Sequence, residues 1–187
     1  MINKTPIKFL NVTWIDFEDD CIALSKKIRD IKIDKIIAIS RGGLVASRIL
    51  SDLLTVKISH ISISSYKNLK QDNEPTINDV PNENLTGKSL LIVDDVSDTG
   101  KTLKRAIKYF KDLNVGTVYT AAPYIKPYTI QVPDFWVKKT KSWIIFPYEI
   151  KETAYAFLKI FKTKEKVAKE LLTLGFKKST INYVLSK

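Results

Sequence analysis

The sequence is poor in the residues that build covalent cross-links and metal cages. It has one cysteine, Cys21, and one histidine, His60, among its 187 residues. A single cysteine excludes a disulfide framework and a cysteine metal site within the chain, and we assign His60 no role. No apolar run approaches the roughly 20 residues that cross a bilayer, and the N-terminus lacks a signal-peptide hydrophobic region. We therefore expect a cytoplasmic protein without a membrane partner.

The remaining composition is that of an ordinary globular protein. Hydrophobic residues make up 44% and charged residues 27% of the chain, which excludes general disorder. The length favours one domain with a sizeable core. The net charge of +11 permits binding of nucleic acid or of phosphorylated small molecules, and residues 151–187 carry nine Lys and three Glu. Because a Lys- and Ile-rich composition is also one route to thermostability, charge alone does not choose a partner.

One stretch, residues 91–103, combines a buried strand, two carboxylates and a polar turn. The apolar run from Leu90 to Val93 predicts the strand, and Asp94 and Asp95 follow it. The turn then offers backbone N–H groups and hydroxyls at the start of a predicted helix, which makes a phosphate cradle from Asp98, Thr99, Gly100, Lys101 and Thr102. The spacing of a Walker loop is absent. The two carboxylates suit a sugar diol or a magnesium ion. A phosphorylated ribose would therefore fit both the carboxylate pair and the phosphate cradle. The alternative is an acidic turn that only caps a helix.

A second candidate anion site precedes this stretch by one strand and one helix. Residues 35–40 predict a core strand and residues 44–54 a helix, and the turn between them contains Ser40, Arg41, Gly42 and Gly43. Glycines let backbone N–H groups approach a ligand, and a guanidinium suits phosphate oxygens. In an open parallel sheet both turns lie at the carboxyl ends of strands and face one crevice.

The rest of the chain predicts scaffold and one long loop. Thr13 and Asp16 form a capping box before a helix with an apolar face, and further strands are expected at 56–66, 116–122, 135–137 and 143–149. The polar stretch 67–86 predicts a lid that excludes water, with an inconsequential disordered tip as the alternative. Taken alone, Lys126 before Pro127 is a surface cation and Trp143 is a core residue.

Together these segments resemble the 6-oxopurine phosphoribosyltransferases of the type I phosphoribosyltransferase family. The resemblance covers roughly residues 10–150 and is carried by residues 12–14, 40–44, 62–66, 92–102, 124–127 and 143–149, in the family's order. It implies an α/β fold with a mostly parallel twisted sheet, helices on both faces, a flexible lid loop and a small hood. The domains would be 1–150, with the hood, and a basic helical extension at 151–187.

The resemblance also implies an activity and residue roles. Phosphoribosyl pyrophosphate (PRPP) would donate its sugar to guanine, hypoxanthine or xanthine in purine salvage. Asp94 and Asp95 would hold the ribose hydroxyls, directly or through Mg²⁺, and Asp98 would act at purine N7. Residues 98–102 would bind the 5′-phosphate, and residues 40–43 the pyrophosphate. Lys126 would contact the 6-oxo group, Trp143 would stack on the base, and the Ile144 carbonyl would accept from its 2-position.

Two features depart from the bacterial xanthine–guanine type. Lys101 stands where that type commonly has glycine, and the spacing from Lys126 to Trp143 is two residues shorter. The chain could also be a regulator of this fold that senses PRPP or nucleotide and binds nucleic acid, or an enzyme acting on adenine or a pyrimidine. An ammonium at Lys126 argues against adenine, because it cannot accept from a 6-amino group.

The extension at 151–187 lies outside the resemblance and predicts three helices. Apolar spacing marks two of them, Gly175 ends the second, and Ser179 is the expected cap of the third. Packing on the core or on a neighbouring subunit is the expected role. A homodimer is usual for proteins that look like this, and nucleic acid is not expected, although the basic extension leaves it open.

Overall fold

The computed structural model describes residues 8–64 and 75–186, which divide into two compact units. The larger unit spans Phe17–Lys141, and the smaller joins the N-terminal residues up to Asp16 to Ser142–Lys187. None of the described helices is long and apolar enough to cross a bilayer.

A mostly parallel sheet forms the centre of the larger unit. In the described part of the chain the strand order is β4-β3-β2-β5-β7-β6, and β8 also pairs with β7. The strand pairs run parallel except for β3 and β4. The bounds are β2 Lys35–Ser40, β3 Ile58–Ser64, β4 Thr76–Asp79, β5 Leu90–Val93, β6 Val96–Ser97, β7 Val118–Ile125 and β8 Phe135–Lys139.

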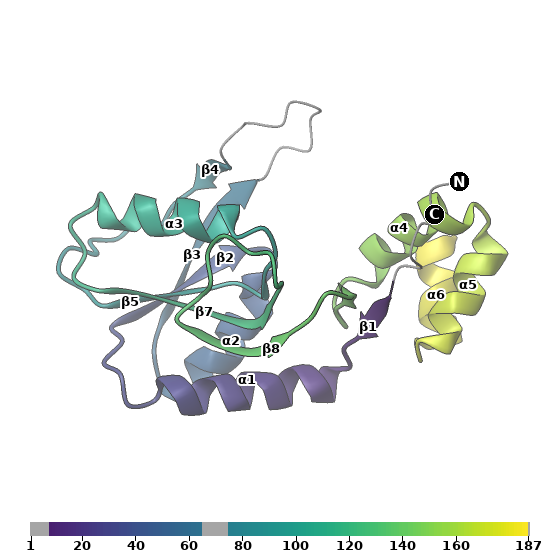
Figure 1. Cartoon of the computed structure of the whole chain (residues 1–187), viewed down its shortest axis with the longest axis horizontal. Coiled ribbons are helices and arrows are strands. Elements are labelled where there is room, and N and C mark those ends of the chain that lie inside the picture. Colours follow the sequence, from purple (N-terminus) through teal and green to yellow (C-terminus); the bar gives the residue numbers. More distant parts are fainter. Residues whose placement is uncertain (1–7, 65–74, 187) are drawn as a thin grey trace. The chain divides into compact units, whose positions relative to one another are not determined.

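Helices cover both faces of this sheet (Figure 1). Helix α3 (Lys101–Lys111) lies on one face, and α1 (Trp14–Ile28) and α2 (Gly43–Leu54) lie on the other. Leu103 and Phe110 of α3 pack with Ile37 and Ile92 in one apolar cluster. On α1 the predicted apolar face is fully buried, and burial raises the pKa of the Cys21 thiol to about 12. The predicted α/β architecture is confirmed.

The polar stretch at 67–86 is not all loop. Residues 76–79 form β4, which pairs antiparallel with β3 at the edge of the sheet. The sequence gives little sign of this strand, because only Ile77 packs against the core and the other three residues are exposed, so no apolar alternation appears. Residues 67–74 of the predicted lid lie outside the described residues. Strand β7 also differs from its prediction, since it begins two residues later and continues to Ile125.

Strands β1 and β9 share a core with three helices in the smaller unit. Strand β1 (Phe9–Asn11) pairs in parallel with β9 (Trp143–Ile145), and the helices are α4 (Ile150–Phe161), α5 (Lys164–Thr173) and α6 (Lys178–Leu185). Ile145 packs with apolar residues from all three helices. The rings of Phe9 and Phe157 meet edge-on at 5.0 Å, and Asn11 Nδ2 donates to the Leu174 carbonyl at 2.6 Å. The domain boundary at residue 150 stays a prediction.

The predicted helix signals are confirmed at two ends and wrong at a third. Thr13 and Asp16 bond reciprocally at 3.0 and 3.1 Å, as a capping box requires. Gly175 follows α5 with a φ of +85°. However, Ser179 does not cap α6: the helix begins at Lys178 and its N-cap is Lys177, which makes no side-chain cap bond. Ser179 instead lies in the first turn.

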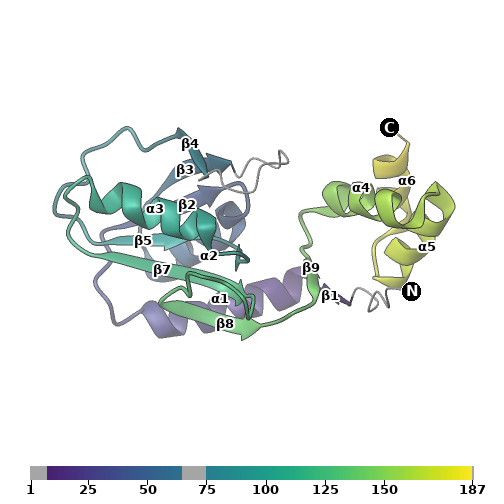
Figure 2. The same ribbon diagram turned by 45° about the horizontal axis from the view of Figure 1, so that its top comes forward.

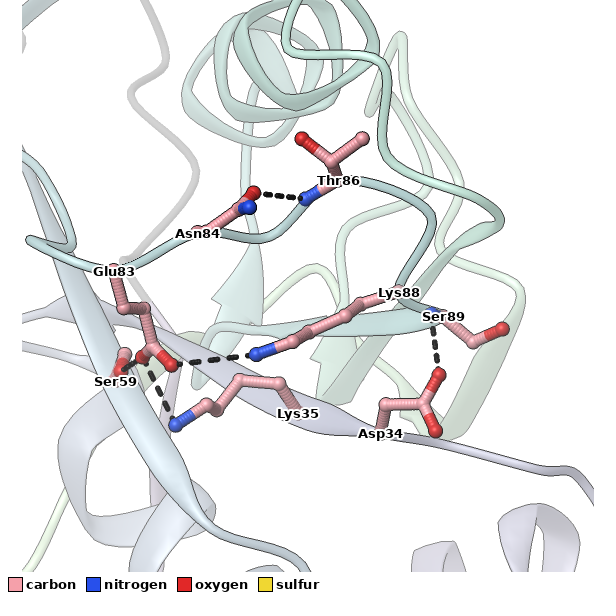
Figure 3. A network of polar contacts seen from close by, with 8 residues as sticks. All are labelled: Asp34, Lys35, Ser59, Glu83, Asn84, Thr86, Lys88 and Ser89. Carbon is pink, nitrogen blue, oxygen red and sulfur yellow. Dashed lines mark hydrogen bonds and ion pairs between the residues drawn. The ribbon is translucent and has the colours of Figure 1, made fainter.

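An ion-pair network stabilises the amino-terminal end of β2 (Figure 3). Glu83 lies 2.9 Å from Lys35 Nζ and 3.7 Å from Lys88 Nζ, and it also accepts from the Ser59 hydroxyl. The hydrogen bond from Ser59 and the two lysine charges lower the pKa of Glu83 from its ordinary value of 4.5. Lys35 is the first residue of β2 and Ser40 is the last. The network therefore stabilises the end of β2 that lies away from the candidate site.

We expect Glu83→Gln to destabilise the protein only while Glu83 is ionised. The amide can still accept from Ser59 but loses its attraction to the lysines. Since the folded-state pKa is lowered, the stabilisation is present above pH 4.5 and is lost as the pH falls through the folded value. Thermal unfolding against pH should show a deficit of about 1 kcal/mol or less at neutral pH, because the carboxylate is partly exposed. A deficit that stays constant down to the most acidic pH would contradict this origin.

Candidate active site

The two predicted anion sites lie at one edge of the sheet. Strand β2 pairs in parallel with β5, and Ala38 aligns with Val93. The turn that follows Ser40 and the carboxylates that follow Val93 therefore leave the sheet side by side. The sequence alone predicted that the glycine turn and the carboxylate pair share one crevice, and the parallel pairing of β2 with β5 places them on neighbouring strands.

The turn after β2 packs directly on one of the carboxylates. A Cβ added to Gly42 would lie 2.7 Å from both carboxylate oxygens of Asp95, and a Cβ on Gly43 would lie 2.2 Å from the Val93 carbonyl oxygen. A side chain at Gly42 would have to displace the Asp95 carboxylate, and one at Gly43 would collide with backbone atoms. The peptide bond between Ser40 and Arg41 is cis. Helix α2 starts at Gly43 with no side-chain cap bond and no acidic residue in its first turn, which suits an anionic ligand.

The two carboxylates differ in exposure. Asp95 is 6% exposed, whereas Asp94 is half-buried and its Oδ1 accepts from the Asp95 N–H at 3.0 Å. The described residues contain no cluster of three or more side chains that could hold a metal ion. Mg²⁺ needs no such cluster, because it keeps several waters and is held by one or two carboxylates together with substrate phosphates. The donor chemistry of Asp94 and Asp95 therefore fits a magnesium ion that arrives with a phosphorylated ligand.

Residues 129–131 contact the predicted phosphate loop and stabilise its conformation. Gly100 has a φ of +81°, and a Cβ there would lie 2.5 Å from the Gln131 nitrogen. Ser97 Oγ donates to the Gln131 carbonyl and lies 2.8 Å from Thr129 Oγ1. The Ile130 N–H donates to the Thr99 carbonyl at 3.0 Å. Asp98, Thr99 and Lys101 are exposed, and Thr102 is half-buried in the first turn of α3.

Asp98 has two neighbours from the segment that follows β7. The Tyr128 hydroxyl donates to Asp98 Oδ1 at 2.7 Å, and this bond is the main reason that the pKa of Tyr128 is raised to about 12. Burial lowers the pKa of Lys126, which is 6% exposed, while the charge of Asp98 opposes that effect. The Lys126 N–H donates to the Ser97 carbonyl at 3.0 Å. Tyr128 was not predicted, because nothing in the local pattern marks a long-range partner of Asp98.

If Asp98 acts in the PRPP-dependent transfer that the sequence resemblance implies, Tyr128→Phe should lower turnover about tenfold, the effect of losing one hydrogen bond to a charged group. The KM for PRPP should change little, because Tyr128 contacts the carboxylate of Asp98. Steady-state kinetics of Tyr128→Phe, of an Asp98→Asn variant and of the double variant measure the coupling. If Tyr128 acts by positioning Asp98, the double variant loses no more turnover than Asp98→Asn alone. Additive losses would assign Tyr128 an independent role.

The remaining two predicted base contacts belong to the smaller unit. Trp143 and Ile144 are neighbours on β9; Trp143 is 49% exposed and Ile144 is 7% exposed. The Trp143 N–H donates to the Lys8 carbonyl at 2.8 Å. An exposed indole offers a face for stacking, and the roles of both residues stay predictions.

A parallel α/β sheet with two glycine-containing turns and a carboxylate pair beyond its strands is typical of the class of proteins that bind ligands at the carboxyl ends of the strands. Residues 13–155 match the family described as phosphoribosyl transferase domain. The chain belongs to this phosphoribosyltransferase family.

Individual relatives share both sequence and fold. The chain is 29% identical over 154 residues to a xanthine-guanine phosphoribosyltransferase from Cereibacter sphaeroides, which covers 76% of this chain and 88% of the relative. A purine phosphoribosyltransferase crystal structure from Pyrococcus horikoshii is 36% identical with a TM-score of 0.70, over 76% of this chain and 94% of that one. A hypothetical protein from Neisseria gonorrhoeae with bound ppGpp is 26% identical with a TM-score of 0.69, over 78% and 91%.

Proposed function

We propose that the protein transfers the phosphoribosyl group of PRPP to a 6-oxopurine base in purine salvage. The observation that carries this proposal is the packing of Gly42 against Asp95, which brings the turn after β2 directly beside the carboxylate pair. PRPP has a phosphate at one end and a pyrophosphate at the other, with a diol between them. The similarity to purine and xanthine-guanine phosphoribosyltransferases supports a purine as the acceptor.

The turns would hold the two ends of PRPP. Residues 98–102 at the start of α3 would bind the 5′-phosphate, and residues 40–43 would bind the pyrophosphate. Asp94 and Asp95 would hold the ribose hydroxyls and Mg²⁺, whose charge would neutralise the pyrophosphate. Such a reaction depends mainly on positioning and on electrostatic stabilisation by preorganised donors.

The transfer would need no covalent enzyme intermediate. The bond from the ribose C1′ to the pyrophosphate oxygen breaks, and its electron pair leaves with the pyrophosphate. Purine N9 then forms the new bond to C1′. The proton that the purine loses passes to Asp98 at the N7 side, where Tyr128 holds the carboxylate. Donors around residues 41–43 stabilise the leaving charge.

The base specificity would come from Lys126, Trp143 and Ile144. An ammonium at Lys126 donates to a 6-oxo group, and it cannot accept from the 6-amino group of adenine. Trp143 would stack on the ring, and the Ile144 carbonyl would accept from the 2-position. We also expect a cytoplasmic homodimer.

Nucleotide synthesis from each purine base tests the proposal. The protein is incubated with Mg²⁺, PRPP and guanine, hypoxanthine, xanthine or adenine, and the products are separated by chromatography. We expect a nucleoside 5′-monophosphate and pyrophosphate from at least one 6-oxopurine, in equal amounts, and none without Mg²⁺. If AMP were the only product, the acceptor would be adenine and the proposal of a 6-oxopurine acceptor would be wrong. No nucleotide from any base would contradict the enzymatic reading and favour a regulator.

A further inference from the structure

The three C-terminal helices form a small group (Figure 2) whose apolar side chains pack together with Ile145 of β9. Phe157 of α4, Val167 and Leu171 of α5, and Ile181 and Val184 of α6 belong to one buried cluster. None of the residues assigned to the proposed transfer reaction lies on these helices.

The connection between α5 and α6 is short and sharply defined. Four residues, 174–177, separate the two helices. The Gly175 N–H donates to the Leu172 carbonyl, and the Phe176 N–H donates to the Leu171 carbonyl, which together form a Schellman motif. Lys164 Nζ, at the start of α5, donates to the Leu185 carbonyl at the end of α6 at 2.6 Å. A glycine-containing turn of this length occurs both in αα-hairpins and in helix-turn-helix units.

The outer face of α6 is polar and has no acidic residue. Its inward residues are Ile181 and Val184, and its exposed residues are Lys178, Ser179, Asn182 and Tyr183. Lys177, just before the helix, is exposed as well. No Asp or Glu occurs after Glu170, so the acidic residues of the extension lie on α4 and α5. A face of lysine, hydroxyl and amide groups suits a polyanion.

We propose that this helical group is a helix-turn-helix that binds duplex DNA, with α6 lying in the major groove. In such units the N-terminal part of the second helix contacts base edges. Lys178, Ser179 and Asn182 occupy that part of α6, and lysine and asparagine are side chains that bond to guanine and adenine edges. Lys177 lies where a phosphate contact is expected. Duplex RNA is a poorer fit, because its deep and narrow major groove does not admit a helix.

The proposal is tested with the full-length protein and a fluorescent DNA duplex of about 30 base pairs, long enough for two half-sites one helical turn apart. Binding is followed by anisotropy between about 50 and 200 mM KCl. The protein should bind in the micromolar range at low salt, and duplexes enriched from a random library should bind more tightly. The Lys177→Ala/Lys178→Ala variant should bind more weakly, with a salt slope smaller by about 2.

A second variant separates base contacts from charge. Asn182→Ala keeps the salt slope but should lower affinity for the enriched duplex by about tenfold, the loss of one good contact to a base. The matched control, Lys108→Ala/Lys111→Ala, removes two exposed lysines from α3 and should leave DNA binding unchanged. Thermal unfolding checks that all variants fold.

Each contrary outcome overturns the proposal. These are absent binding at low salt, equal losses in the α3 control, tighter binding to duplex RNA, and a change of oligomeric state in the α6 variants with DNA binding intact. The test is independent of the proposed transfer reaction, because the α6 variants contain no residue assigned to it. Their nucleotide synthesis should equal that of the wild type.

Discussion

Asp98→Asn is expected to lower turnover by about 10²–10³-fold, the usual effect of removing one preorganised group that acts in the transition state. The amide keeps the size of the side chain, so PRPP affinity should change little. Single-turnover kinetics and equilibrium binding of PRPP measure the two effects separately. In the structure Asp98 is exposed and accepts from Tyr128, a position from which it can meet a base.

The matched control is Asp112→Asn, at the far end of α3 from the phosphate loop. It makes the same chemical change and should leave turnover at the wild-type level. Unchanged turnover in Asp98→Asn would remove this residue from the mechanism. Loss of PRPP affinity equal to the loss of turnover would make Asp98 a binding residue instead.

Gly42→Ala is expected to reduce kcat/KM by about 100-fold or more with the fold intact. The added Cβ would lie 2.7 Å from both oxygens of Asp95, so this carboxylate must move. A displacement of about 1 Å in a site of this kind costs about 100-fold in rate. Because the obstacle is the end of a side chain, the melting temperature should fall only slightly. Kinetics and thermal unfolding of the same preparation measure both quantities.

Gly43→Ala provides the contrast. There the added Cβ would lie 2.2 Å from the backbone carbonyl of Val93, in the adjacent strand β5, and backbone cannot rotate aside. We expect this variant to lose stability as well as activity. If Gly42→Ala retained full kcat/KM, the turn after β2 would not be holding Asp95 in place for the reaction.

The elements around the candidate site could be predicted because their signals are local. The buried run at β5, the two glycines after β2 and the capping box at Thr13 each depend on neighbours in the sequence. Parallel pairing of β2 with β5 then follows from the alternation of strands and helices.

The parts that could not be predicted depend on long-range contacts. Tyr128 meets Asp98 across 30 residues, and Gln131 accepts from Ser97 across 34. Nothing in the segment after Lys126 marks these partners. The predicted cap of α6 was also wrong: a serine near a helix start is a strong signal, but α6 begins at Lys178, so Ser179 already lies inside the helix.

The apolar cluster around Ile145 has a practical consequence for shortened versions of the protein. Removing residues 151–187 to obtain a minimal transferase would take away Phe157, on which Phe9 rests, and the helices that cover Ile145. Strand β9, which carries Trp143, would then lose its support. If Trp143 stacks on the base as proposed, a truncated protein that failed to use a purine would reflect the loss of this support and would not assign the extension a role in catalysis.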